Sequence, residues 1–255
     1  MKTNNRINKI RKYLEENGFT TVSKLAEVFS VSTMTIRRDL NSLEELNLVM
    51  REKGGAIPKT PIFLEERYEK KKIENVRIKR KITKEAIKLI EDGDVVFLDA
   101  GSTTFMLAEL IIESEFKNIT LVTNDLNIAF YLRNEENINL IFIGGNISKV
   151  THSSRGSIAA DNIRQLHFDK CFMGVSFIGE NFKLFTPAEE KIEYKRQVLL
   201  NTKIKVLLTD MSKFNKNSLY YITDIEEFDI LITNKENDIV DINYFKERKL
   251  EVIKA

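Results

Sequence analysis

Five segments of the chain carry residue types suited to binding an anion, and each directly follows a short apolar run. The first of them combines a glycine with three hydroxyl residues at the expected start of a helix. A glycine lets backbone N–H groups approach a ligand closely, and a helix N-terminus adds partial positive charge, so this segment suits a phosphate. Its candidate ligand-binding residues are Asp99, Gly101, Ser102, Thr103 and Thr104.

The other four segments add amide, glycine, hydroxyl and lysine groups. They are Thr123-Asn124-Asp125, Gly144-Gly145-Asn146, Gly174-Val175-Ser176 and the stretch of Asp210, Met211, Ser212, Lys213 and Phe214. A lysine supplies a compact cation, so convergence of all five segments favours a phosphorylated sugar or polyol as ligand. Each segment alone has an equally good interpretation as an ordinary turn or helix cap. Neither G-x-G-x-x-G nor G-x-x-x-x-G-K-[ST] occurs, so a dinucleotide or nucleoside triphosphate is not indicated.

The apolar runs before these segments predict the element that positions them. Runs rich in β-branched residues at 95–98, 120–122, 140–143, 170–175, 205–208 and 230–232 alternate with helical stretches. Strands that are apolar on both faces and separated by helices indicate an α/β fold with a doubly wound, mainly parallel sheet. Ligands of such sheets bind outside the carboxyl ends of the strands, where the polar segments lie.

The N-terminal part of the chain predicts a winged helix-turn-helix. Apolar spacings of three and four residues indicate helices at 4–17, at about 22–29, and from an N-cap at Ser32 to about residue 46. The brief turn between the last two is typical of a helix-turn-helix, in which the second of them enters the DNA major groove. A short hairpin follows at 48–57, with basic residues Arg51 and Lys53 expected at its tip.

Residues on the outward face of the third helix could contact DNA. Arginine can bond guanine through two N–H groups, asparagine can bond adenine, and other basic side chains neutralise phosphates. A three-helix interaction module with solvated arginines is the alternative. The predicted DNA-binding residues are Ser32, Thr33, Met34, Thr35, Arg37, Arg38, Asn41, Arg51 and Lys53.

Composition limits the remaining classes of protein. Residues 1–80 carry 18 Lys and Arg against 11 Asp and Glu, although the whole chain has a net charge of only +2. A basic N-terminal segment followed by an acidic remainder of the chain is typical of a nucleic-acid-binding module fused to another domain. We expect neither a membrane segment nor a signal peptide, and therefore a cytoplasmic protein. One cysteine, Cys171, and two histidines predict no disulfide, no metal site and no cofactor.

Three regions follow from these patterns: a winged helix-turn-helix at 1–57, a linker with the start of a connecting helix at 58–76, and an α/β domain at 77–255. Residues 58–65 hold two of the three prolines, which indicates a stiff, extended join. The basic stretch KKKIENVRIKRK that follows is either a solvated connecting helix or an additional DNA contact.

Nearly the whole chain resembles the DeoR family of bacterial transcription regulators. The segment VSKLAEVFSVSTMTIRRDLNSLEELNLVMREKGGA is similar to its winged-helix signature. FLDAGSTT, LVTN, IFIGG, the YKR of IEYKR, and LTDMSKF are similar to blocks of its sensor domain. The resemblance implies a sensor with the fold of ribose-5-phosphate isomerase that binds phosphorylated sugars. It also implies repression of an operon for sugar uptake or catabolism. We expect a homo-oligomer, dimer or tetramer, whose winged helices match operator half-sites.

The resemblance transfers effector-binding roles to single positions. These are Asp99, Gly101, Ser102, Thr103, Thr104, Thr123, Asn124, Gly144, Gly145, Lys195, Asp210, Ser212 and Lys213. Two departures from the family pattern occur: Lys183, Leu184 and Phe185 replace a glycine and a threonine-rich turn, and Lys53 stands where histidine is common before Gly-Gly.

Two functions remain from the sequence. The first is a DNA-binding repressor that a phosphorylated sugar releases from its operator. The alternative is an isomerase-like enzyme, for which Asp99, Asp125 and Asp210 are the candidate bases at strand ends. The fused DNA-binding module favours the repressor, since a fold alone does not imply activity.

Overall fold

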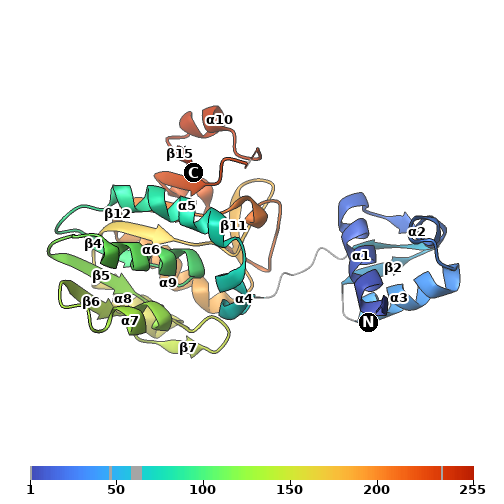
Figure 1. Ribbon diagram of the computed structural model, residues 1–255, viewed down its shortest axis with the longest axis horizontal. Coiled ribbons are helices and arrows are strands. Elements are labelled where there is room, and N and C mark those ends of the chain that lie inside the picture. Colours follow the sequence, from blue (N-terminus) through green and yellow to red (C-terminus); the bar gives the residue numbers. More distant parts are fainter. Residues whose placement is uncertain (1, 46–47, 59–64, 237) are drawn as a thin grey trace. The chain divides into compact units, whose positions relative to one another are not determined.

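The computed structural model describes residues 2–45, 48–58, 65–236 and 238–255. The chain divides into two compact units, Met1–Ile62 and Phe63–Ala255 (Figure 1). The proline-containing join predicted at 58–65 lies outside the described residues, apart from its first and last positions.

The first unit is a winged helix-turn-helix, as predicted. Its elements in chain order are α1 (Lys2–Asn17), β1 (Thr20–Thr21), α2 (Val22–Phe29), α3 (Thr33–Glu45), β2 (Val49–Glu52) and β3 (Gly55–Pro58). The three strands form an antiparallel sheet in the order β1-β3-β2. Helix α1 ends before Gly18, which has a φ of +67°, and Ser32 Oγ accepts a hydrogen bond from the Thr35 N–H at the start of α3. Both boundary signals of the sequence are confirmed.

The three helices enclose a small apolar core. The buried side chains that they share with the wing are Ile10, Leu14, Val22, Leu25, Ile36, Leu40, Leu43, Val49 and Ala56. On α3 the buried positions Ile36, Leu40 and Leu43 follow the helical spacing that the sequence predicts. The opposite face of α3 is therefore open to solvent.

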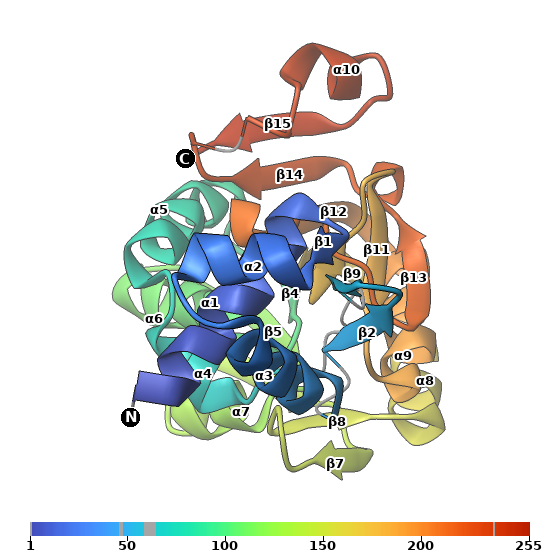
Figure 2. The same cartoon turned by 90° about the vertical axis from the view of Figure 1, so that its right-hand side faces the viewer.

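The second unit is built on a seven-stranded parallel sheet. Its strands are β4 (Val95–Leu98), β5 (Ile119–Thr123), β6 (Ile138–Phe142), β9 (Phe168–Met173), β12 (Thr202–Leu208), β14 (Ile230–Thr233) and β15 (Glu251–Lys254). Every pair of neighbours is parallel, in the order β15-β14-β12-β9-β4-β5-β6. The six predicted strands are confirmed. Figure 2 shows the seventh, β15, beside β14 at one edge.

Helices cover both faces of this sheet. They are α4 (Tyr68–Ile73), α5 (Val76–Ala86), α6 (Ser102–Glu113), α7 (Leu126–Leu132), α8 (Ser157–Arg164), α9 (Ile192–Leu200) and α10 (Ile242–Lys246), with one-turn 3-10 helices η1 (Ile87–Leu89), η2 (Glu189–Lys191), η3 (Met211–Lys213) and η4 (Ile225–Glu227). Within β4, Val96 and Leu98 pack in the core with α5 and α6, whereas Phe97 packs in the core with α8 and α9. Two separate cores on one sheet confirm the doubly wound α/β arrangement.

Two small antiparallel sheets lie outside this pattern. One contains β7 (Asn146–Ser148) and β8 (Ser153–Arg155), and the other contains β10 (Phe177–Ile178), β11 (Lys183–Thr186) and β13 (Tyr220–Asp224). The unusual stretch Lys183 to Phe185 therefore forms part of a strand. The sequence did not predict these five strands, and three of them, β7, β8 and β10, are only two or three residues long.

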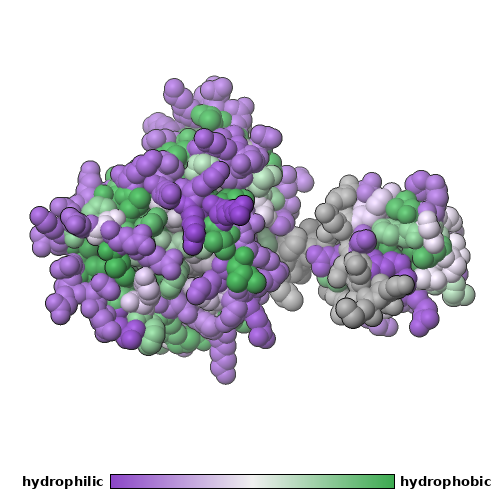
Figure 3. Space-filling model, in the orientation of Figure 1, coloured by the Kyte–Doolittle hydropathy of each residue, from purple (hydrophilic) through white to green (hydrophobic). Residues whose placement is uncertain are grey.

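Hydrophilic residues cover most of the second unit on the face shown in Figure 3, and hydrophobic residues form smaller, separate areas. No helix within the described ranges is both long and apolar enough to cross a membrane.

Candidate functional site

The exposed face of α3 carries most of the predicted DNA-binding residues. Ser32, Thr33, Met34, Arg37, Arg38 and Asn41 are exposed, as is Lys53 in the turn of the wing, and Thr35 and Arg51 are partly buried. Arg51 lies within β2, opposite Ala56, and not at the tip of the hairpin as predicted. Its Nη1 donates to Asn41 Oδ1 at 2.8 Å, which joins the wing to the exposed face of α3.

An ion pair inside the first unit orients this helix. Asp39 is only 3% exposed, and its two carboxylate oxygens accept hydrogen bonds from Arg6 Nε and Nη2 at 2.7 and 3.1 Å. The pair connects α1 to the buried side of α3. Since Asp39 faces inward, Arg37 and Arg38 face outward, where they can meet nucleic acid.

A pocket in the second unit lies at the carboxyl ends of three adjacent strands, β4, β9 and β12. The chain runs from β4 outward to β5 and β6, and then returns to place β9 on the other side of β4. The order of strands therefore reverses between β4 and β9. Such a switch point is where open α/β sheets bind ligands.

The pocket brings together most of the predicted effector-binding residues. Those that line it are Asp99, Gly101, Ser102, Thr103, Thr104, Lys195, Asp210 and Lys213. Three others lie outside the lining but bond to residues beside or in it: Thr123, Asn124 and Ser212. Gly144 and Gly145 also lie outside it, against the loop and helix that follow β8.

Asp99 is the buried centre of this pocket. Its Oδ2 accepts hydrogen bonds from Lys195 Nζ at 2.5 Å and from the Gly174 N–H at 3.2 Å, and its Oδ1 accepts one from the Tyr194 hydroxyl at 3.2 Å. Asp99 is 1% exposed and the Lys195 side chain is 7% exposed. Such a carboxylate, held by donors from three positions, fixes the ends of β4, β9 and helix α9 relative to one another.

The first turn of α6 presents free backbone donors. No acceptor within the described part of the chain takes the N–H groups of Ser102, Thr103 and Thr104. In contrast, the Gly101 N–H donates to Asp125 Oδ2 at 3.1 Å. The donors available to a phosphate therefore come from the three residues after the glycine.

Thr123 and Asn124 are fully buried and hold the end of β4 and the residues that follow it. Thr123 Oγ1 donates to the Leu98 carbonyl at 2.7 Å, and Asn124 Oδ1 accepts from the Ala100 N–H at 3.1 Å. Asp125 caps helix α7 through the N–H groups of Asn127 and Ile128. Burial raises the pKa of Asp125 to about 6.

Gly145 allows a close approach of two chain segments. Its φ is +158°, and a Cβ atom there would lie 3.0 Å from the Arg155 carbonyl and 3.1 Å from the Ala159 Cβ. The geometry of this glycine thus serves the packing of α8 against the loop after β6.

Three pocket lysines are absent from the predicted set: Lys71, Lys79 and Lys191. Lys79 lies on the buried side of α5 with Ile82, Thr83 and Ala86. The apolar spacing of Ile82 and Ala86, continued one turn toward the N-terminus, reaches Lys79, so the sequence did hold a signal for it. Lys191 lies in η2, and no local pattern places it in a pocket.

The basic stretch before α5 is therefore not wholly solvated. Lys79 Nζ donates to the backbone carbonyls of Lys71 and Glu74, the latter at 2.7 Å. Burial lowers the pKa of Lys79. Burial, together with the nearby Lys191, lowers the pKa of Lys71 to about 8. Burial thus disfavours the charged form of both lysines, and an anion bound beside them would favour it.

Among the described residues no group of three or more His, Cys, Asp and Glu side chains could hold a metal ion. Cys171 is buried in β9, and burial raises its pKa to about 12. The thiol accordingly packs as a small apolar side chain.

Sequence comparisons match both units to known families. The DeoR-like helix-turn-helix domain matches residues 6–61, and the DeoR C terminal sensor domain matches residues 74–235. The chain is 31% identical over 253 residues to the putative aga operon transcriptional repressor of Escherichia coli O157:H7, covering 98% of this chain and 93% of that protein. It is 30% identical over 235 residues to the glycerol-3-phosphate regulon repressor of Escherichia coli K12, covering 92% of each.

A comparison of structures finds ribose 5-phosphate isomerase A of Methanocaldococcus jannaschii. That protein is 23% identical over 55% of each chain, with a TM-score of 0.40.

Proposed function

Since the chain belongs to the DeoR family of transcription regulators, we propose that it represses an operon for sugar uptake or catabolism and leaves its operator when a phosphorylated sugar binds the sensor pocket. The observation that carries this proposal is the pocket at the switch point of the sheet. It combines five lysines with the three free N–H groups of α6.

The names of relatives support repression as the sign of regulation. Two proteins that align along nearly the whole chain are named repressors, one of a glycerol-3-phosphate regulon and one of an aga operon. Glycerol 3-phosphate, which the first of these names contains, is a phosphorylated polyol, and such a compound agrees with the phosphate-binding role proposed for the pocket. The proposed site of action is the cytoplasm, where the operator is.

The proposed effector residues are those that the sequence predicts, joined by Lys71, Lys79 and Lys191 from the pocket. Thr123, Asn124, Gly144 and Gly145 would act by holding the loops that contact the ligand, because they lie outside the lining. Ser212 would act on Asp210, whose Oδ1 accepts its N–H at 2.9 Å.

The three carboxylates considered as isomerase bases already serve other groups. Asp99 binds Lys195 and Tyr194, Asp125 caps α7, and Asp210 caps η3. The relatives along the whole chain are transcription regulators and not enzymes. The protein is accordingly a regulator, and a steady-state isomerase assay with ribose 5-phosphate should show no turnover.

Thermal unfolding of the purified protein tests the effector half of the proposal. The ligands would be fructose 1-phosphate, fructose 1,6-bisphosphate, tagatose 6-phosphate, glucitol 6-phosphate and ribose 5-phosphate. A ligand at 100 times its Kd stabilises the folded state by about 2.7 kcal/mol, which raises the Tm by several degrees. If no phosphorylated compound shifts the Tm, the sensor proposal is wrong and the DNA-binding half stands.

Selection of binding sites from random duplex DNA tests the other half. We propose that the protein binds as a dimer or tetramer, so the selected sequences should contain two related half-sites. Arg38→Ala should weaken binding to the selected site by about 1–3 kcal/mol and relax the base preference at one position. Arg164→Ala, an exposed change in the second unit, is the matched control and should leave binding unchanged.

A further inference from the structure

Two glutamates at the start of the second unit lie against the pocket lysines. Glu65 forms an ion pair with Lys191, and its Oε1 lies 3.8 Å from Lys71 Nζ. Glu66 Oε2 lies 3.7 Å from Lys213 Nζ, while its Oε1 accepts a hydrogen bond from Lys70 at 2.7 Å. Glu65 and Glu66 therefore contact three of the five lysines that line the pocket.

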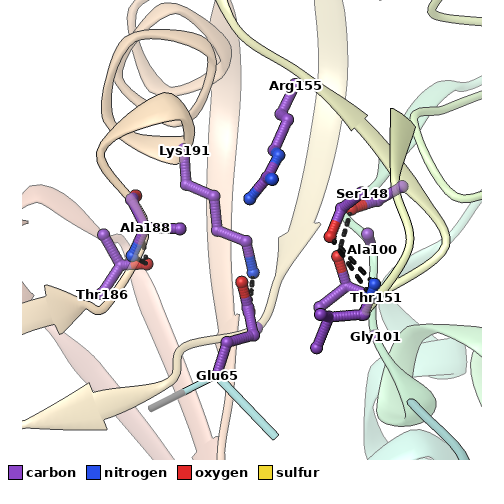
Figure 4. Close-up of polar contacts among 12 residues, drawn as sticks. Glu65, Ala100, Gly101, Ser148, Thr151, Arg155, Thr186, Ala188 and Lys191 are labelled. Atoms are coloured by element: carbon purple, nitrogen blue, oxygen red, sulfur yellow. Dashed lines mark hydrogen bonds and ion pairs between the residues drawn. The ribbon is translucent and has the colours of Figure 1, made fainter. Parts of the chain in front are cut away.

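The carboxylate of Glu65 is nearly buried against lysine side chains, as a bound anion would be. Its side chain is 10% exposed, and that of Lys191 is 7% exposed. Burial alone would raise the pKa of Glu65, but Lys191, and less strongly Lys71 and Arg155, lower it below its ordinary value. Figure 4 shows Lys191 and Arg155 extending toward Glu65 from separate elements, with Gly101 and Thr151 across the same space. Lys71 of α4 and Lys191 of η2 thus share one carboxylate, and Arg155 of β8, which pairs with Glu190, adds positive charge beside it, the arrangement expected of an anion subsite.

The charges of the pocket match those of the two glutamates. Five lysines and three carboxylates line it, namely Glu74, Asp99 and Asp210, which leaves an excess of two positive charges. The carboxylates of Glu65 and Glu66 supply two negative charges. A phosphate monoester carries close to two negative charges at neutral pH, so it could replace both carboxylates without changing the charge of the pocket.

We propose that Glu65 and Glu66 occupy the anion subsite of Lys71, Lys191 and Lys213 in the free protein, and that a phosphate monoester dianion binds there by displacing them. The inference rests on the proposed sensor function and adds the means of regulation. Ligand and glutamates cannot hold the same lysines together, because two anions at one cation cluster repel each other.

The displaced residues connect the sensor to the DNA-binding unit. Glu65 follows Pro58, the last residue of wing strand β3, by seven positions in the chain. A ligand that releases Glu65 therefore acts on a residue only seven positions along the chain from the wing. The ligand thereby distinguishes two states of Glu65 and Glu66, which is the differential affinity that any effector needs in order to shift an equilibrium.

Calorimetric titration of the full chain with inorganic phosphate at pH 7 tests the competition. In the wild type, displacement of the two glutamates costs part of the free energy of phosphate binding. The double variant Glu65→Gln/Glu66→Gln should therefore bind phosphate at least about tenfold more tightly. Glu69→Gln is the matched control, since it removes a carboxylate from the same helical region that is 66% exposed and faces His152. Its affinity should equal that of the wild type, whereas Lys191→Gln should bind phosphate more weakly than any of them.

Equal phosphate affinity in the wild type and the double variant overturns the displacement and leaves the sensor proposal intact. Absence of phosphate binding in every chain, with no Tm shift from the phosphorylated sugars, overturns both.

Hydrogen exchange of the wild type gives a test that needs no variant. The Tyr68 N–H donates to the Val150 carbonyl at 3.0 Å, and the Lys71 N–H donates to the Arg67 carbonyl at 3.2 Å. Saturating phosphate should accelerate exchange of both amides, because release of Glu65 and Glu66 loosens this segment. Unchanged or slower exchange at both positions contradicts the displacement.

Discussion

At the scale of single residues, the pocket depends on charges that are buried with their partners. Asp99 and Lys195 form such a pair, and neither side chain is more than 7% exposed. A buried pair is not in itself strongly stabilising, but loss of one member leaves the other charged and desolvated. Lys195 therefore positions Asp99 and the strand ends that Asp99 holds together.

Replacement of Lys195 by methionine should destabilise the second unit. The Asp99 carboxylate would keep Tyr194 and the Gly174 N–H but lose its cation, at a cost of about 3–5 kcal/mol. Lys203→Met is the matched control, since Lys203 pairs with Asp169 at 2.6 Å but is 78% exposed, and it should cost less than about 1 kcal/mol. Urea unfolding measures both. Equal losses would contradict a special role for the buried pair.

A second residue-scale prediction concerns pH. The folded pKa of Asp125, about 6, exceeds its ordinary value of 3.8, so the folded chain binds more protons than the unfolded chain between about pH 4 and 6. This group therefore lowers stability as the pH rises through that window. In Asp125→Asn the group no longer titrates, so the stability of the variant relative to wild type should improve by roughly 2–3 kcal/mol from pH 4 to pH 7.

Unfolding free energies at the two pH values test this. The comparison uses the pH dependence alone, because the asparagine also loses one acceptor for the Gly101 N–H at every pH. Parallel profiles for variant and wild type would show that the Asp125 carboxylate titrates normally.

At the scale of elements, the wing requires one close backbone approach. Gly55 begins β3 and pairs with Thr21 of β1. A Cβ atom at Gly55 would lie 2.4 Å from the Thr20 carbonyl oxygen and 2.9 Å from the Phe19 ring. Strands β1 and β3 can therefore pair only if residue 55 has no side chain, which gives the second glycine of Gly-Gly a role distinct from the first.

Alanine at each of the two positions separates these roles. Gly54 has a φ of +86° and open space around it, so Gly54→Ala should cost about 1–2 kcal/mol through its backbone conformation alone. Gly55→Ala must displace backbone, and we expect a greater loss together with weaker DNA binding, because the wing would move relative to α3. Thermal unfolding and binding to the selected DNA measure the two effects. A smaller loss for Gly55→Ala than for Gly54→Ala would contradict the steric account.

At the scale of the whole molecule, two units each have a core of their own. The core of the first unit contains Leu40, and one core of the second contains Leu207, both fully buried. The two functions should consequently respond separately to loss of packing, and coupling between them should depend on the chain that joins them.

Leu40→Ala and Leu207→Ala test this independence. Each should lower the stability of its own unit by about 2–5 kcal/mol through the cavity that it leaves. We expect Leu40→Ala to weaken DNA binding while phosphate affinity stays within about twofold of wild type. Leu207→Ala should weaken phosphate binding while DNA affinity stays within about twofold of wild type. Scanning calorimetry with phosphate titration provides the measurement. Loss of phosphate affinity in Leu40→Ala would show that the units do not fold independently.

The sequence by itself determined the elements and the family of this protein. Helix caps, apolar spacings of three and four residues, and apolar β-branched runs are local signals, so they identified α1 to α3, the wing and six of the seven parallel strands. The same local signals located the polar segments at the strand ends, and eight of the predicted effector-binding residues line one pocket.

The tertiary structure alone decided which other residues share that pocket. Lys191 lies more than a hundred residues along the chain from Lys71, which lines the pocket with it, and from Glu65, its ion-pair partner. Strand order reverses between β4 and β9, and this reversal brings such distant segments together. No local periodicity encodes that meeting. Thr123 and Asn124 contact Leu98 and Ala100 at the end of β4 because β5 lies beside β4 in the sheet. Sheet order, and not distance along the chain, decides which strand ends are neighbours.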